Sequence, residues 1–189
     1  MLRPPVCFSL LTALLMLPAC TGTLQAEEPA PPAEKITATV TDWAGVEQVI
    51  RQHRGKPVIV DLWSTSCEPC LRELPGLARL QQMLGDRVVC VTVSLDYFGG
   101  GKGPSAELQQ EVLKVLRQQK LQSINLISST PDETIYTRLD LGSVPAVLVY
   151  SREGKLVHRF DNEEDKYGEK GFTYDGHILP YVRDLLSGG

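Results

Sequence analysis

The chain has 189 residues, of which 42% are hydrophobic and 22% are charged, and its formal net charge is −4. This length and composition fit one globular domain with a sizeable core and leave too few residues for two ordinary domains. The 19 Lys and Arg residues are outnumbered by 23 Asp and Glu residues and form no basic stripe. Nucleic acid is therefore excluded as an expected partner.

The first twenty residues predict an export signal. Arg3 is their only charged side chain, and residues 6–17 (VCFSLLTALLML) form an apolar run that is short for a permanent membrane-spanning helix. The run leads into Leu-Pro-Ala-Cys, which resembles a bacterial lipobox, although a proline stands where a small residue is usual. We therefore expect residues 1–20 to be a signal peptide of lipoprotein type, with lipid attached at Cys20.

Two alternatives for the processing of this segment stay open. It could be cleaved by an ordinary signal peptidase, for example after Ala26, or it could remain as an uncleaved anchor. All three place the protein outside the cytoplasm, in the periplasm or cell envelope. Residues 21–35 (TGTLQAEEPAPPAEK) are rich in Pro, Ala and Glu and have no apolar period, which predicts a flexible tether or a simple spacer.

The remaining residues, 36–189, predict one α/β domain in which strands and helices alternate. Period-two and continuous apolar runs indicate strands, apolar residues at helical spacing indicate helices, and Gly and Pro mark their ends. Strands are expected at 36–41, 58–63, 88–95, 124–127, 144–150 and 156–160, and helices at 42–54, 68–84, 105–119, 131–139 and 175–186, the last interrupted at Pro180. This order implies helices on both sides of a mixed sheet.

Cys67 and Cys70 stand two residues apart, which fits a redox pair, half of a zinc site, or two buried neighbours. A zinc site needs further ligands, but the histidines, His53, His158 and His177, are scattered singly without ligand spacing. We expect these histidines to lie at or near the surface, and no metal to be bound. Cys90 falls within a predicted buried strand and is expected to be a small core residue.

The position of the pair favours redox chemistry. Cys67 follows a buried strand and opens a helix, where free backbone N–H groups and the helix dipole stabilise a thiolate. Cys67 is therefore the expected nucleophile, and Cys70, one turn further on, is expected to resolve the mixed disulfide. Pro69 fits the first turn of a helix, whereas the negative charge of Glu68 opposes the thiolate.

The segment DLWSTSCEPC resembles the thioredoxin superfamily, and its Glu-Pro dipeptide is similar to that of the TlpA/ResA branch of exported, membrane-tethered thiol-disulfide oxidoreductases. A second motif, LGSVPA at residues 141–146, resembles the Gly-x-x-Pro element of the family. The resemblance covers about residues 36–187. It implies a thioredoxin-like sandwich with a helical insertion after the second core strand, near 96–123, and a cis peptide bond between Val144 and Pro145 that faces the cysteines.

The resemblance also implies roles for single residues. Asp61 falls where thioredoxins carry a buried acid, and a desolvated carboxylate there can accept the proton of Cys70. An ordinary hydrogen-bonding aspartate at the end of a strand is the alternative. Trp63 is expected to pack beside the pair, although core packing alone would explain it. The full set expected to bind substrate is Trp63, Glu68, Pro69, Val144 and Pro145.

The function expected from these features is thiol-disulfide exchange with exported proteins, without a cofactor other than the disulfide of Cys67 and Cys70. Tethered relatives are usually reductants, which implies a membrane electron donor and substrates such as apocytochrome c. The alternatives are a peroxiredoxin-like thiol peroxidase, a metal-delivery protein and a non-catalytic binding module. Peroxiredoxins carry a threonine three residues before the reactive cysteine, whereas Thr65 lies two residues before Cys67, which disfavours the peroxidase. The acidic stretch 161–172 is expected to be a solvated loop or a partner contact.

Overall fold

The structure, a computed structural model, describes Met1 and residues 35–163 and 166–188. The predicted signal peptide, Cys20 and nearly all of the predicted tether lie outside these residues. Within the described ranges, no helix combines the length and apolar character needed to cross a bilayer. The description below concerns the unit that begins at Glu34.

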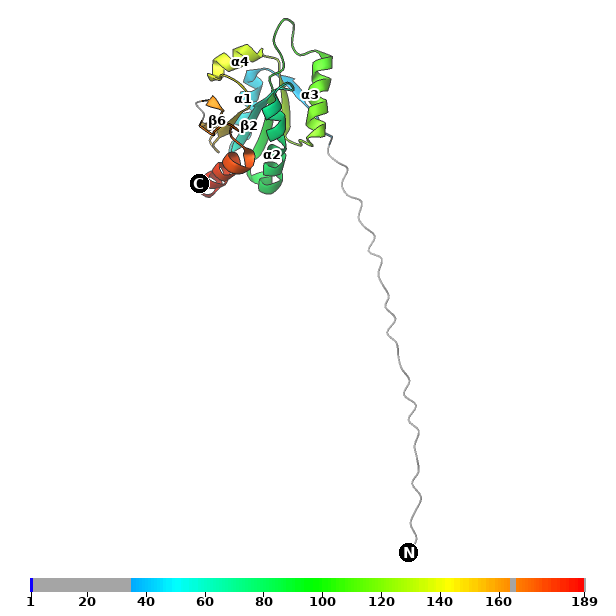
Figure 1. Ribbon diagram of the computed structural model, residues 1–189, viewed down its shortest axis with the longest axis vertical. Coiled ribbons are helices and arrows are strands. Elements are labelled where there is room, and N and C mark those ends of the chain that lie inside the picture. Colours follow the sequence, from blue (N-terminus) through cyan, green and yellow to red (C-terminus); the bar gives the residue numbers. More distant parts are fainter. Residues whose placement is uncertain (2–34, 164–165, 189) are drawn as a thin grey trace. The chain divides into compact units, whose positions relative to one another are not determined.

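Six strands form one mixed sheet at the centre of this unit (Figure 1). Their spatial order is β1-β4-β3-β2-β5-β6. The first four are parallel to one another, whereas β5 and β6 run antiparallel to their neighbours. The strands are β1 (Thr39–Thr41), β2 (Val58–Trp63), β3 (Val89–Ser94), β4 (Ile124–Ser128), β5 (Ala146–Tyr150) and β6 (Leu156–Phe160).

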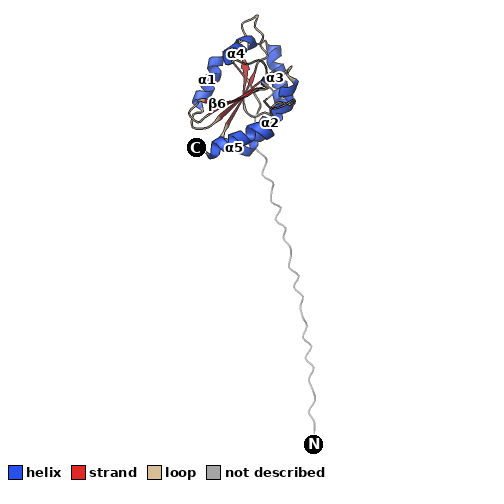
Figure 2. Ribbon diagram, turned by 60° about the vertical axis from the view of Figure 1, so that its left-hand side comes forward, coloured by secondary structure: helices blue, strands red, loops and turns tan. Residues whose placement is uncertain are grey.

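Helices cover both faces of the sheet (Figure 2), and each face has its own apolar cluster. One cluster joins the sheet to α2 (Glu68–Leu84), α3 (Ala106–Gln118) and α5 (Leu179–Ser187). The other joins it to α1 (Trp43–Gln52) and α4 (Asp132–Leu139). All six residues of β2 are buried, as expected for a central strand covered on both faces. The predicted sandwich of a mixed sheet flanked by helices is confirmed.

Alternation along β2 decides which side chains face the cysteine-bearing helix. Ile59 and Trp63 belong to the cluster with α2, and Val60 belongs to the opposite cluster. Asp61 lies between Val60 and Leu62, so it points to the same face as Ile59 and Trp63. Its charge is therefore placed in the apolar layer between the sheet and α2.

Helix starts follow the capping chemistry of the sequence. The Asp42 side chain accepts from the Gly45 amide at the start of α1, and the Ser105 hydroxyl accepts from the Leu108 amide at the start of α3. The helix α3 and the strand β4 follow β3, where the helical insertion was predicted. A short 3₁₀ turn, η1 (Gly85–Arg87), joins α2 to β3.

Two predicted elements differ in extent. β1 is only three residues long because its pairing with β4 begins at Thr39, so residues 36–38 fall outside the sheet. The predicted helix at 175–186 begins instead with a five-residue π-helical turn, η3 (Tyr174–Ile178), and α5 follows it. Pro180 lies in the first turn of α5, where its missing N–H group is not needed.

Candidate active site

The cysteine pair lies where β2 passes into α2, and it forms a disulfide. The Sγ atoms of Cys67 and Cys70 are 2.02 Å apart. Cys67 is the N-cap residue of α2 and is partly exposed, whereas Cys70 is 1% exposed and belongs to the apolar cluster beneath the helix. Solvent and partners therefore reach the sulfur of Cys67 far more easily than that of Cys70.

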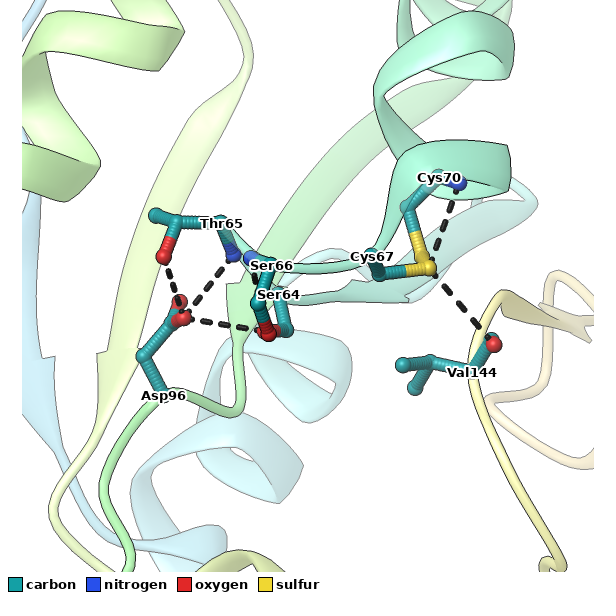
Figure 3. The surroundings of a disulfide bond; sticks show 7 residues. All are labelled: Ser64, Thr65, Ser66, Cys67, Cys70, Asp96 and Val144. Atoms are coloured by element: carbon teal, nitrogen blue, oxygen red, sulfur yellow. Dashed lines mark hydrogen bonds between the residues drawn. A yellow bond between two sulfur atoms is a disulfide. The ribbon is translucent and has the colours of Figure 1, made fainter.

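The start of α2 provides a hydrogen bond to the outer sulfur. The backbone N–H of Cys70 donates to Cys67 Sγ at an N···S distance of 3.2 Å (Figure 3). No residue earlier in the chain could satisfy this amide through the helix, because it belongs to the first turn. After reduction, the same N–H and the helix dipole would stabilise negative charge on Cys67.

The loop before β5 faces the cysteines from the other side of the site. The peptide bond between Val144 and Pro145 is cis, and the carbonyl oxygen of Val144 lies 3.6 Å from Cys67 Sγ (Figure 3). In the disulfide Cys67 has no hydrogen to donate, so this is a contact rather than a hydrogen bond. Because β5 runs antiparallel to β2, the start of one strand lies at the end of the other. The motif at 141–146 is thus brought to the cysteine pair.

The acidic stretch that follows β6 contacts this loop. Glu163 Oε1 accepts a hydrogen bond of 2.7 Å from the amide of Gly142. Arg159 donates to Asp161 and to the carbonyl oxygens of Leu139 and Asp140. Glu163 of this stretch and the neighbouring Arg159 of β6 therefore hold the segment that leads to the cis proline.

Asp61 is 3% exposed, and its Oδ2 accepts a 2.5 Å hydrogen bond from the hydroxyl of Tyr174. Burial raises the pKa of Asp61 to about 7, although the hydrogen bond from Tyr174 lowers it, and the charge of Glu73 adds a smaller increase. The carboxyl group is thus both buried and hydrogen-bonded, and it titrates near neutral pH.

The other predicted substrate-binding residues divide by exposure. Glu68 and Pro69 are exposed in the first turn of α2, next to the disulfide. Trp63 is fully buried in the cluster that contains Cys70, and its Nε1 has no hydrogen-bond partner among the described residues. Trp63 therefore supports the site from below, and a direct contact of its ring with a bound protein is excluded in this state.

A buried carboxylate that sequence reasoning missed holds the segment between β2 and Cys67. Asp96 is 5% exposed, and its Oδ1 accepts hydrogen bonds from Ser64 Oγ and from both the amide and the hydroxyl of Thr65 (Figure 3). Its Oδ2 accepts from Ser94 Oγ at 2.6 Å. A signal was present in the sequence, since Asp96 directly follows a predicted strand that a helix connects to β2, and strands joined in this way usually run parallel, with their carboxyl ends at one edge of the sheet.

Tyr174 was also missed, and no sequence pattern pointed to it, because 113 residues separate it from Asp61.

The three histidines are each partly buried, and Cys90 is a buried free thiol in β3 whose pKa burial raises to about 12. Among the residues that the structure describes, no group of three or more His, Cys, Asp or Glu side chains could hold a metal ion.

Comparisons with known proteins agree with this geometry. No protein-family profile matches the chain. The thiol-disulfide oxidoreductase ResA of Bacillus cereus is 24% identical over 133 residues, which are 70% of each protein. The thioredoxin-like protein YneN of Bacillus subtilis is 31% identical over 51 residues, which span 27% of this chain and only 30% of YneN.

Among solved structures, a secreted Mycobacterium tuberculosis disulfide oxidoreductase homologous to Escherichia coli DsbE superposes with a TM-score of 0.52. It is 18% identical, and the match covers 70% of this chain and 84% of that one. The chain therefore has a thioredoxin-like fold that carries a Cys-x-x-Cys disulfide at the start of α2. It is similar in sequence to ResA, a thiol-disulfide oxidoreductase, and similar in structure to a protein homologous to DsbE.

Proposed function

We propose that this protein is an exported thiol-disulfide oxidoreductase that acts as a reductant of protein disulfides outside the cytoplasm. The observation that carries the proposal is the unequal exposure of the two disulfide-bonded cysteines at the start of α2. An exposed sulfur can form a mixed disulfide with a protein, and a buried neighbour one helical turn away can resolve it.

In the proposed reaction the reduced Cys67 thiolate attacks a substrate disulfide, forms a mixed disulfide and releases one substrate thiolate. Cys70 then attacks Cys67, which closes the disulfide found in this structure and releases the second substrate thiolate. Asp61 is the proposed acceptor of the Cys70 proton. The carbonyl oxygen of Val144 and the exposed first turn of α2 line the place where a substrate chain would lie.

Export, lipid attachment at Cys20 and the direction of electron flow are the finer parts of this proposal. They are supported by the sequence of residues 1–20 and by likeness to the TlpA/ResA branch. A tethered reductant needs a membrane electron donor to stay reduced in an oxidising compartment. Oxidised apocytochrome c and other exported proteins with disulfides are the proposed substrates.

Insulin reduction driven by dithiothreitol tests the exchange activity of the purified full chain. We expect turnover by the wild type and loss of it in C67S, while C90S, which removes a buried free thiol that is not part of the disulfide, serves as the matched control. Activity retained in C67S would exclude Cys67 as the nucleophile. Turnover of hydrogen peroxide, or one equivalent of copurified metal, would favour the peroxidase or the metal-delivery function instead.

The reduction potential of the pair tests the direction. Equilibration with glutathione or dithiothreitol buffers should give a value near that of thioredoxin, about −270 mV, for a reductant. A value near about −120 mV would identify an oxidant and contradict the proposed direction.

A further inference from the structure

Tyr174 connects the C-terminal part of the chain to the buried acid of the active site. It is 1% exposed, and its hydroxyl donates to Asp61 Oδ2 at 2.5 Å. A buried tyrosine hydroxyl needs a hydrogen-bond partner, and a carboxylate is the strongest acceptor available in a protein. The pair therefore satisfies two polar groups that would otherwise be costly to bury.

Three independent contacts hold Tyr174 in place. Its backbone amide donates to Glu73 Oε2 of α2 at 3.2 Å, so the main chain is tied to the cysteine-bearing helix. Its ring lies directly against Gly76, where any side chain would collide with it, since an added Cβ would lie 2.7 Å from Tyr174 Cγ. The hydroxyl is the third contact. Such a side chain has little freedom to leave the carboxyl group.

We propose that Tyr174 is a positioning residue for thiol-disulfide exchange, and that its hydroxyl holds the Asp61 carboxyl group in place and stabilises the ionised form that accepts the proton of Cys70. This inference rests on the proposed function of Asp61. In the step concerned, the S–H proton of Cys70 moves to the Asp61 carboxylate. The resulting Cys70 thiolate attacks Cys67 Sγ of the mixed disulfide, and the substrate sulfur leaves as a thiolate.

The charged and titratable groups around Asp61 allow the effect of Tyr174 to be separated from theirs. Glu73 faces Asp61 from α2 and raises its pKa, whereas the hydrogen bond from Tyr174 lowers it. Cys90 of β3 also interacts with Asp61, but its own raised pKa of about 12 keeps it neutral at ordinary pH. Removing the hydroxyl of Tyr174 and removing the charge of Glu73 should therefore shift the titration of Asp61 in opposite directions.

The first measurement is a ¹³C NMR titration of the Asp61 carboxyl carbon in the oxidised full chain, with the signal assigned by its loss in D61N. The closed disulfide keeps Cys67 and Cys70 from titrating, so this readout does not depend on activity. We expect the pKa of Asp61 to rise in Y174F by about one pH unit or more, the size set by one hydrogen bond to a charged group. In E73Q, which keeps an acceptor for the Tyr174 amide, it should fall.

Tyr167 provides the matched control, because it is a half-buried aromatic residue whose ring packs on Phe172 and His177 rather than on the Asp61 carboxyl group. Y167F should leave the Asp61 titration unchanged. An unchanged Asp61 titration in a Y174F protein with wild-type circular dichroism would overturn the proposal. If Y174F does not fold, the absence of a downward shift in E73Q, whose fold should persist, would overturn the electrostatic arrangement on which it rests.

The second measurement is the pH profile of insulin reduction. We expect the acidic limb of the profile to move to higher pH in Y174F, by the same amount as the pKa of Asp61. A titration shift without a shift in the profile would overturn the role in exchange while leaving the dithiol activity intact. Absence of activity in the wild type would contradict the proposed function itself, and the NMR result would still show whether Tyr174 governs the ionisation of Asp61.

Discussion

Asp61 is ionised in the folded protein only at the cost of stability. Its pKa is about 7 in the folded state, whereas an aspartate in an unfolded chain titrates near 3.9. Between about pH 4 and pH 7 the folded state therefore binds more protons than the unfolded state. Since stability then falls as pH rises, the contribution of this group is fully present below pH 4 and is lost as pH passes through 7.

The variant D61N should remove this dependence. The amide is neutral, and its oxygen can still accept from Tyr174, so we expect D61N to be more stable than the wild type at pH 8 by about 1–4 kcal/mol. The upper limit follows from a pKa difference of about three between the folded and the unfolded state. Near pH 4 the two proteins should be nearly equal. Urea unfolding of the oxidised proteins at both pH values measures the difference.

Glu169 supplies a control for this experiment, because it is an exposed acid whose neutralisation should change stability little. E169Q should therefore follow the wild-type pH dependence. If D61N and the wild type have the same free energy of unfolding at pH 8, the burial of ionised Asp61 does not destabilise the folded protein. The same variant should slow disulfide exchange if Asp61 accepts the Cys70 proton, so stability and activity should change in opposite directions.

At the scale of elements, the close approach of α2 and η3 depends on one missing side chain. Gly76 is buried in the middle of α2 and lies against Tyr174. In a solvated helix, replacing glycine by alanine stabilises by roughly 0.5–1 kcal/mol. Here the added methyl group has no room, so the usual gain should be reversed.

We expect G76A to destabilise the protein by about 1–3 kcal/mol, as overpacking of a core does. Thermal or urea unfolding measures this change, and Q82A, at an exposed position of the same helix, should be nearly neutral. A G76A protein as stable as the wild type would show that η3 can move away from α2 without loss. The Asp61 titration would then be expected to change in G76A, because Tyr174 would have moved with η3.

The segment between β2 and α2 illustrates how a short loop can be made rigid by one carboxylate. Asp96 accepts four hydrogen bonds from residues on two neighbouring strand ends. Ser66 is tied into the same segment, because its amide donates to Ser64 Oγ. Cys67 therefore follows a fixed stretch of chain, which places its sulfur near the carbonyl oxygen of Val144 before any substrate arrives.

On the scale of the whole molecule, burial of the sheet is uneven from centre to edge. All six residues of β2 are buried between two paired strands, whereas β1 is a three-residue edge strand with two exposed residues. Amides of a central strand exchange with solvent only on global unfolding, while those of a short edge exchange by local opening.

Hydrogen exchange followed by NMR should therefore give opening free energies for the β2 amides that equal the free energy of unfolding. The amides of β1 should open more readily, and so should those of β6, the opposite edge, where Leu156 and Val157 are exposed. The buried strand β3, which pairs with β2, serves as a positive control. Equal protection in β1 and β2 would contradict this gradient of stability.

Features that depend on one short stretch of chain could be predicted from the sequence, whereas contacts between residues far apart in the chain could not be predicted from local rules. Local rules placed α2 at its observed bounds, because strand, cap, proline and terminal glycine all agree within one stretch of chain. They also placed Cys67 at the N-cap. The spatial order of the strands was not predicted. That the Val144–Pro145 peptide faces the cysteines came only from the resemblance to a known family, since 77 residues separate Val144 from Cys67.

The contact of Tyr174 with Asp61 was predicted neither by local sequence rules nor by the resemblance to a known family. Tyr174 directly precedes residue 175, where an ordinary α-helix was expected to begin. The sequence therefore offered no expectation of where its side chain points. The π-helical turn turns Tyr174 into the core and allows its hydroxyl to reach Asp61. A buried aspartate implies that some donor must come to it, but sequence periodicity does not say from which element.

The active site is also shared between two stretches of chain that a single loop divides. The loop after β3 contains three glycines with positive φ, at 99, 100 and 103, and an exposed Phe98. Everything before it supplies the cysteines and the buried acid, and everything after it supplies Val144, Pro145 and Tyr174. A chain opened at this loop would therefore yield two fragments, neither of which has a complete site. Recovery of catalysis would then report their reassembly, which makes the loop a natural place to divide the protein into a complementation pair.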